Sequence, residues 1–403
     1  MVHATDAPRS QWSTVTLAVL GGIVVALQVG KVPPAIPALR AELGLGLVEA
    51  GLVASLFALL GACSGVPLGA LLNRRGPRLA MTAATAALAC GAVLGALAQS
   101  GAGLLLARVL EGFGFVGIAV SAPRLIVLAS LPRDRTLALG LWGTYMPIGM
   151  ALAMLVGGPL VALAGWRWLW WLASAAALVY LLAFQWLGRR FVLAPEPPAA
   201  PLADSLRSAF RRPGPWLLAG CFGFYSLQFF AVATWLPTYL SEAAAFSASG
   251  AAQWTALVVA ANTVGNIVTA LLLHRGMARA PLLLVAYLVM AATGTALLTL
   301  ALPAAAKLLL AVLFTGFGGL LPAAVLAGAA LHAPSLRDVP TVAGASVQGA
   351  NLGNLLGAPA MAAAVSLFGG WAAAPALLLG CCLVGIGLTV CLAVVERRLS
   401  AAR

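Results

Sequence analysis

The chain consists of long apolar runs separated by short segments that hold most of its charge. A helix needs about 20 residues to cross a hydrocarbon core of roughly 30 Å, and each run is at least that long. The runs predict twelve spans, at 14–38, 48–73, 79–99, 104–130, 136–164, 167–187, 215–242, 249–273, 281–301, 305–331, 341–368 and 371–395. The pattern therefore predicts an all-α membrane protein with twelve transmembrane helices.

Composition supports this assignment. The chain is 62% hydrophobic and 8% charged, with a mean hydropathy of +1.03, so a soluble protein of 403 residues would lack the charges to cover its surface. The net charge of +13 does not indicate nucleic-acid binding, because the arginines lie in short clusters between apolar runs. Neither the six cysteines nor His3, His274 and His332 have metal-ligand spacing, so we expect no metal, no cofactor and no enzyme active site.

The distribution of basic residues predicts the orientation. With the N-terminus inside, the inner segments hold 17 of the 23 Lys and Arg residues, and the outer loops hold only Arg40, Arg167 and Lys307. Inner loops of membrane proteins are enriched in Lys and Arg. The sequence thus predicts a multi-pass protein of a bacterial-type cytoplasmic (inner) membrane with both termini cytoplasmic, and we expect a monomer.

A repeat divides the chain into two parts. A shift of 200 residues aligns Pro37 with Pro237, Gly65 with Gly265, Arg75-Gly76 with Arg275-Gly276, Gly157 with Gly357 and Pro159 with Pro359. The Pro-rich stretch APEPPAAP (194–201) reads as an extended linker between the repeats. We expect a six-helix bundle at 1–187, a cytoplasmic linker at 188–214 and a second, pseudo-symmetric six-helix bundle at 215–403.

Small residues recur every four positions in four of the spans, which lets helix backbones approach closely. The stripes are Gly61, Gly65 and Gly69 in span 2; Gly149, Ala153 and Gly157 in span 5; Ala261, Gly265 and Thr269 in span 8; and Gly349, Gly353 and Gly357 in span 11. Two interpretations are open: generic packing, or an interface at which the two bundles move against each other.

Three motifs give the chain a resemblance to the major facilitator superfamily. The family's loop motif between spans 2 and 3 is matched here by Gly69-Ala-Leu-Leu-Asn-Arg-Arg-Gly-Pro-Arg78, which resembles it. The family's span 4 signature is similar to Arg108-Val-Leu-Glu-Gly112. A further string that is common in the family, Gly165-Trp-Arg-Trp168, follows span 5. The resemblance covers essentially the whole length. It implies a twelve-helix secondary transporter that works by alternating access, with a loop that takes part in gating.

The gating residues implied by this resemblance are Gly69, Asn73, Arg74, Arg75, Gly76 and Arg78, together with Asp134. Asn73 replaces the family's usual Asp, so the loop lacks that negative charge, and Asp134 is an alternative partner for Arg74 or Arg78. In span 5, Ala162-Leu163 replaces the glycine pair that ends the family's antiporter signature. This departure weakens the case for a drug/proton antiporter.

Away from the span ends, the predicted spans contain four charged residues: Lys31, Arg108, Glu111 and Arg124. A charge in a span costs several kcal/mol and therefore needs a partner or a function. Lys31 and Glu111 lie about 10 Å below the outer boundary, which predicts an ion pair between spans 1 and 4. Glu111, the only carboxylate away from the span ends, is the predicted proton-coupling residue together with Arg108, for which snorkelling to the outer surface is the alternative.

Three cations against one carboxylate suggest an anionic substrate. Uncharged polar residues at similar depth are Gln28, Tyr145, Gln228, Asn262, Asn266, Gln348, Asn351 and Asn354. The predicted substrate-binding residues are Lys31, Arg124, Gln28, Tyr145, Gln228 and Asn262. For Trp168, Trp170 and Trp171 we expect an aromatic belt at the membrane boundary.

These features predict a secondary active transporter of a small anionic or polar organic solute, coupled to protons, whose partners are its substrate, protons and the bilayer. The alternative is a multidrug/proton antiporter that exports lipophilic compounds. Within the superfamily the chain has a weak further resemblance to the cyanate, nitroimidazole and small-organic-anion branches, through strings that belong to the scaffold.

Overall fold

The computed structural model describes residues 10–63, 76–189, 202–243, 246–335 and 338–401. Within these residues the chain is helical throughout its regular structure, and no strand is present. The N-terminal helices are α1 (Trp12–Gly30), α2 (Val32–Leu43), α3 (Leu47–Ser55), η1 (Leu56–Ala58), α5 (Pro77–Ala96), α6 (Gly101–Ala129), α7 (Arg135–Gly143), α8 (Tyr145–Ala164) and α9 (Arg167–Gly188).

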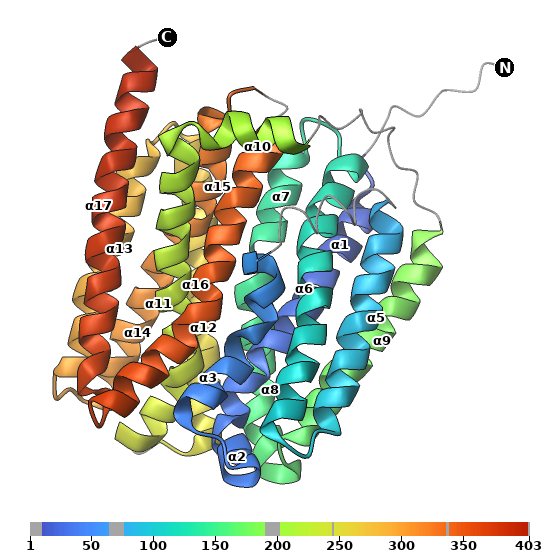
Figure 1. Ribbon diagram of the computed structural model, residues 1–403, viewed down its shortest axis with the longest axis vertical. Coiled ribbons are helices and arrows are strands. Elements are labelled where there is room, and N and C mark those ends of the chain that lie inside the picture. Colours follow the sequence, from blue (N-terminus) through green and yellow to red (C-terminus); the bar gives the residue numbers. More distant parts are fainter. Residues whose placement is uncertain (1–9, 64–75, 190–201, 244–245, 336–337, 402–403) are drawn as a thin grey trace.

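The C-terminal helices repeat this arrangement. They are α11 (Pro213–Ala243), α12 (Ala248–His274), α13 (Arg279–Thr299), α14 (Ala304–Gly318), α15 (Leu320–His332), α16 (Val339–Leu367), η3 (Trp371–Ala373) and α17 (Ala374–Ala401). The short helix α10 (Leu202–Phe210) lies between the two sets and runs across one end of the bundle (Figure 1). The start of α1 and the end of α17 lie at this same end.

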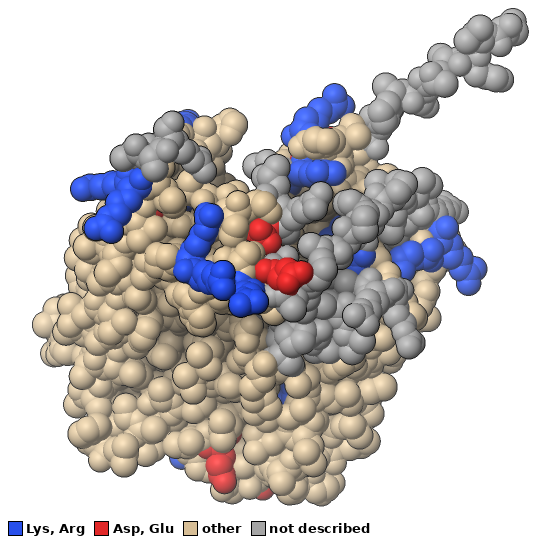
Figure 2. Space-filling view, turned by 45° about the horizontal axis from the view of Figure 1, so that its top comes forward, with Lys and Arg blue, Asp and Glu red and all other residues tan. Residues whose placement is uncertain are grey.

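Eleven helices of the described chain are long and apolar enough to cross a membrane. The remaining predicted span begins as the shorter apolar helix Leu47–Cys63, and its continuation falls outside the described residues. Lys and Arg gather at the end of the molecule that carries α10, whereas the opposite end shows few charges (Figure 2). The predicted membrane architecture is therefore confirmed.

Three spans are broken, and proline accounts for each break. Breaks occur at Lys31 between α1 and α2, at Thr144 between α7 and α8, and at Gly319 between α14 and α15. Pro33, Pro147 and Pro322 follow within two or three residues. Proline has no N–H to donate to the carbonyl four residues earlier, so the helix ladder is interrupted at these positions.

Most of the described stripe glycines pack inside their own bundle and do not form the interface between bundles, whereas Gly61 of span 2 lies against Asn351 of α16 in the other bundle. A methyl group added at Gly149 or Gly157 of α8 would collide with Ala26 or Pro34 in span 1. The equivalent Gly349, Gly353 and Gly357 of α16 lie against the backbone of α11. Helical spacing places these glycines on one face but does not identify the helix that the face meets.

The same helices nevertheless meet across the bundles through other residues. Helix α8 packs on α12, and α3 packs on α16. Gly51 lies against Ala358, and Gly158 lies against Ser249. These contacts, with α2 against α11 and α12, lie toward the end opposite α10 (Figure 1).

Close packing of α16 on α11 predicts opposite effects for two glycine substitutions. Gly353→Ala should lower the free energy of unfolding by about 1–3 kcal/mol, because the new methyl group overlaps the Gly223 carbonyl. Gly380→Ala is the matched control: nothing lies within 4 Å of its added methyl, and alanine is the better helix former by up to about 1 kcal/mol. Thermal unfolding in detergent measures both, and equal shifts would contradict this account of the helix contact.

Candidate functional site

The break in span 1 places Lys31 inside the N-terminal bundle. Its backbone N–H still bonds to the Leu27 carbonyl, while Pro33 and Pro34 begin α2 and leave carbonyls of the preceding turn without helical partners. The Lys31 side chain is 1% exposed. A cation therefore lies at a point where the backbone itself is interrupted.

Lys31 is held by three groups from three spans. Its Nζ lies 2.8 Å from Glu111 Oε1 on α6 and donates to Gln28 Oε1 at 2.5 Å. The same ammonium group lies 4.7 Å from the centroid of the Trp170 ring on α9. Gln28 in turn donates through Nε2 to the Ala173 carbonyl at 3.0 Å. The predicted ion pair between Lys31 and Glu111 is present, with Gln28 as its neighbour.

Arg108 joins the cluster and binds backbone carbonyls near the C-terminal ends of α1 and α3. It pairs with Glu111 Oε2 and donates to the Gln28 carbonyl at 2.9 Å and to the Val53 carbonyl at 2.8 Å. A longer contact of 3.4 Å reaches the Ala54 carbonyl. Carbonyls in the last turn of a helix lack helical partners and favour a cation, so Arg108 satisfies the C-terminal ends of both α1 and α3.

Arg108 is 0% exposed, so the alternative that it snorkels to the outer surface is wrong. Its guanidinium also lies 5.6 Å from the centroid of the Phe57 ring in η1. At the positions that the 200-residue shift aligns with Arg108 and Glu111, the C-terminal bundle has Leu308 and Ala311, which carry no charge. The charged cluster that holds the ends of α1 and α3 is therefore a feature of the N-terminal bundle.

Glycines make room for the cluster. A methyl group at Gly91 of α5 would lie 2.8 Å from the Glu111 side chain, and one at Gly112 would lie 2.7 Å from the Phe57 carbonyl. The cluster formed by Lys31, Glu111 and Arg108 contains two cations and one carboxylate, all at most 1% exposed. Its formal charge of +1 lies in a low-dielectric interior, where it strongly attracts an anion.

Trp170 is a member of the site that sequence reasoning missed. It was expected in an interfacial belt, but it is 0% exposed and lies beneath Lys31, whereas Trp168 and Trp171 are exposed as expected. Three tryptophans in four residues necessarily point in different directions around a helix. That spacing is the one signal that could have separated Trp170 from its neighbours.

The predicted residues of the C-terminal bundle do not join the cluster. Gln228 accepts from the Cys382 thiol at 3.0 Å, which places it between α11 and α17. Asn262 donates to the Tyr225 hydroxyl at 2.8 Å and to the Thr315 carbonyl at 2.9 Å. Both side chains are buried in contacts within their own bundle, so direct contact with the Lys31 cluster is not seen.

The two remaining binding candidates lie elsewhere on the N-terminal bundle. Tyr145 begins α8, and its ring stacks on Trp142 with centroids 4.2 Å apart, close to Gly22 of α1. Arg124 is partly exposed on α6, more than three turns beyond Glu111 toward the end of the helix near α10. Neither contacts Lys31.

Most predicted gating residues, Gly69, Asn73, Arg74 and Arg75, lie outside the described residues. Gly76 adopts a φ of +83°, a left-handed conformation that suits glycine, and Pro77 begins α5. Asp134 accepts from the Ser10 hydroxyl at 2.5 Å, and that hydroxyl also accepts from the Leu131 N–H. In the described part of the chain Asp134 thus contacts the start of the chain and not Arg78.

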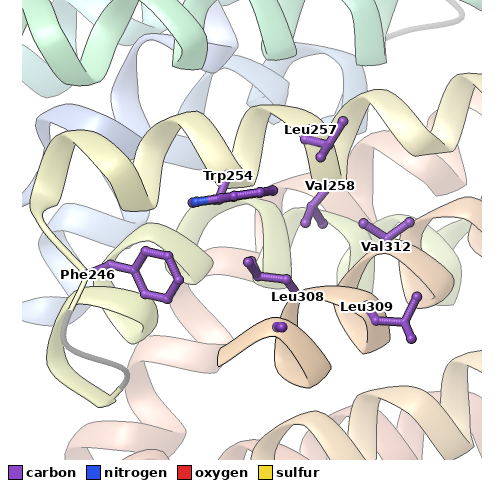
Figure 3. Close-up of a pocket in the computed structure, with 8 residues that line it drawn as sticks. Phe246, Trp254, Leu257, Val258, Leu308, Leu309 and Val312 are labelled. Atoms are coloured by element: carbon purple, nitrogen blue, oxygen red, sulfur yellow. The ribbon is translucent and has the colours of Figure 1, made fainter. Parts of the chain in front are cut away.

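A wholly apolar groove of about 440 Å³ lies on the C-terminal bundle, between α12 and α14. Figure 3 shows Trp254, Leu257 and Val258 of α12 facing Leu308 and Val312 of α14. No charged residue lines it, and Trp254 and Leu257 are about half exposed. The groove offers no group that could fix an anion.

Comparison with known proteins identifies the family. The model of the Major Facilitator Superfamily matches residues 18–334, so the chain belongs to this superfamily of transporters. Its relatives are likewise transporters and not enzymes. The family named on sequence motifs alone is confirmed.

Two bacterial relatives match the chain at similar levels. The probable sulfoacetate transporter of Cupriavidus necator is 28% identical, with 60% of each chain covered. The 3-(3-hydroxy-phenyl)propionate transporter of Escherichia coli is 28% identical over 59% of this chain and 60% of its own. The match therefore spans about three fifths of the length of these relatives.

One solved structure has the same fold. It is a bacterial homologue of the human lysosomal transporter Spinster, described as inward-facing and unoccupied. It aligns with a TM-score of 0.72 and 17% identity and covers 95% of both chains. At this identity the likeness concerns the fold alone.

Removal of the carboxylate should reveal its structural role. Glu111→Ala leaves Lys31 and Arg108 buried without their counter-ion, so we expect a loss of about 3–5 kcal/mol in the free energy of unfolding. Glu42→Ala, which breaks the partly exposed pair with Arg167, should have a much smaller effect. Comparable losses in thermal unfolding for the two variants would show that the cluster is not desolvated.

A second substitution separates charge from geometry. Arg108→Lys keeps the charge but cannot reach the carbonyls of α1 and α3 together, so stability should fall by about 2–3 kcal/mol. Arg133→Lys, at an exposed position, is the control. If Arg108→Lys unfolds at the temperature of the wild type, the bracing of the two helix ends by the guanidinium is refuted.

Proposed function

We propose that the chain is a secondary active transporter that moves a small organic anion across a cytoplasmic membrane together with protons, by alternating access. The carrying observation is the buried cluster of Lys31, Glu111 and Arg108, with its net positive charge in the interior of a transporter fold. A carboxylate or sulfonate group is the ligand chemistry that would neutralise it.

The contacts suggest a different role for each residue. Arg108 is committed to two helix ends, so it acts as a positioning residue. Lys31 is a point charge on a flexible side chain and is proposed to bind the anion, with Gln28 orienting its ammonium group. Trp170 covers the other side of that group and limits its movement.

Glu111 is proposed to couple proton and anion. Protonation removes its negative charge, and Lys31 then loses its ionic partner and becomes available to the substrate anion. After the anion leaves, Glu111 releases its proton and pairs with Lys31 again. Binding of the anion and the proton together leaves the cluster at its resting charge of +1, so the two would cross together without a change of charge at the site.

The distribution of contacts supports a rocking movement of two bundles. The bundles meet at the end opposite α10 through α8 with α12 and α3 with α16, and the basic end of the molecule carries α10. We infer that both termini are cytoplasmic and that the site in this conformation is closed toward the outside.

The remaining predicted residues are assigned roles in gating and binding. The inner end is proposed to be controlled by the loop residues Gly69, Asn73, Arg74, Arg75, Gly76 and Arg78, together with Asp134. Arg124 and Tyr145 are proposed to meet the substrate on this inner side, and Gln228 and Asn262 to face it from the C-terminal bundle in another conformation.

Export of lipophilic compounds is a second candidate. The dehydrocurvularin exporter of Aspergillus terreus is 24% identical over 40% of this chain. The apolar groove between α12 and α14 opens on the outer surface of the bundle and suits a lipophilic molecule (Figure 3). The buried charges do not fit such a cargo, which is why anion transport is preferred.

Transport in proteoliposomes tests the proposal. Sulfoacetate and 3-(3-hydroxyphenyl)propionate are the first compounds to try, because relatives are named for them. An inwardly directed proton gradient should drive accumulation of an anion by the wild type. Lys31→Met should weaken its apparent affinity by roughly 10- to 100-fold, the effect of losing one charged contact.

Glu111→Gln distinguishes coupling from binding. This variant should still exchange anion for anion but no longer respond to the pH gradient, because the amide cannot carry the proton. Arg167→Gln, at the partly exposed pair with Glu42, should transport as the wild type does. Normal accumulation of the anion by Lys31→Met would overturn the proposal, and gradient-driven export of a lipophilic dye without anion transport would favour the exporter.

A further inference from the structure

Helix α10 is amphipathic and presents a basic face away from the bundle. Its residues Leu206, Ala209 and Phe210 are buried or partly buried and share one face, and α10 contacts α11 and α16. Asp204 and Arg207 are exposed on the polar side of the helix, and the exposed Arg211 and Arg212 follow directly after its end. The helix lies across the end of the bundle, as an element at a membrane surface would (Figure 1).

An aromatic pair fixes the C-terminal end of α10 to a transmembrane helix. Trp216, in the first turn of α11, donates through Nε1 to the Phe210 carbonyl at 3.0 Å. The two rings pack with centroids 4.8 Å apart, yet Trp216 remains 60% exposed. Tryptophan with its N–H satisfied and its ring exposed at the end of a span is typical of the headgroup level of a bilayer. The arginines next to it therefore lie at that level.

Charge repulsion at the C-terminal end of α10 calls for an external anion. Arg207, in the last turn of the helix, and Arg211 and Arg212, directly after it, place three like charges within six residues, against the single carboxylate of Asp204 one turn before Arg207. None of the three arginines has an ion-pair partner among the described residues. The partial negative charge of the helix C-terminus favours one nearby cation, but it does not account for three. A phosphate group can accept two parallel hydrogen bonds from the N–H groups of one guanidinium, so its geometry matches the arginine side chain.

We propose that Arg207, Arg211, Arg212 and Trp216, here called the α10 patch, bind the headgroup of an anionic phospholipid in the leaflet that α10 faces. The phosphate lies on the arginines, and the acyl chains pass along the Trp216 ring into the bilayer. Helix α10, at whose C-terminal end the patch lies, is at the end of the molecule where Lys and Arg gather (Figure 1 and Figure 2). This site is independent of the proposed anion transport and takes a lipid, not the transported solute.

Quenching of Trp216 by brominated lipid tests the proposal on the full chain. Wild type and Trp216→Phe are reconstituted in phosphatidylcholine vesicles with a small fraction of brominated phosphatidylglycerol or the same fraction of brominated phosphatidylcholine. The difference between the two proteins isolates the Trp216 signal. Each arginine near a membrane surface strengthens anionic-lipid binding by roughly fivefold, so the triple variant R207Q/R211Q/R212Q should lose about 100-fold in apparent affinity.

A second triple variant controls for overall charge. R275Q/R397Q/R398Q removes the same charge from exposed positions near the same end of the molecule and should keep the phosphatidylglycerol preference. Unchanged thermal unfolding of both triple variants verifies that they are folded. Equal quenching of Trp216 by the two lipids, an unchanged preference in R207Q/R211Q/R212Q, or an equal loss in the control variant would each overturn the proposal.

Discussion

The structure of the N-terminal bundle depends on one interaction, the buried contact between Glu111 and its two cations. In a membrane, water is not available to satisfy a broken helix, so every free carbonyl needs an internal donor. Arg108 supplies that donor to both α1 and α3, and Glu111 makes its burial affordable by balancing its charge. Lys31, at the break in span 1, is held by the same carboxylate. The interrupted helices and the charged cluster therefore require each other.

The C-terminal bundle solves the corresponding problem with neutral groups. Its broken span 10 is braced by Asn262, whose amide bonds to the Thr315 carbonyl and the Tyr225 hydroxyl. The scaffold is duplicated, since α8 packs on span 1 and α16 packs on α11 through equivalent glycines. The chemistry is not duplicated. At the broken spans one bundle carries ions and the other carries neutral amide and hydroxyl groups, so recognition of a charged solute belongs to the N-terminal bundle in the proposed cycle.

Sequence reasoning predicted those features that depend on one helix at a time. The apolar runs gave the spans, and the cost of a buried charge gave Lys31, Arg108 and Glu111 as residues that need partners. It failed where the neighbour of a helix face matters. Trp170 and the glycines of α16 lie on helix faces that, judged from the sequence, could meet either another apolar helix or lipid. Periodicity cannot distinguish such partners, because lipid and protein are equally apolar.

The same contacts provide a physical link between the site and the bundle interface. Span 2 is held by Arg108 on one side, through the carbonyls that end α3. On its other side it meets the C-terminal bundle, where Gln348 of α16 donates to the Ala62 carbonyl at 2.9 Å. A proton on Glu111 would weaken the hold on Arg108 as well as on Lys31, and span 2 would then be freer to shift against α16. In a transporter of this kind, loading of the site and movement of the bundles would be coupled through a helix that binds no substrate.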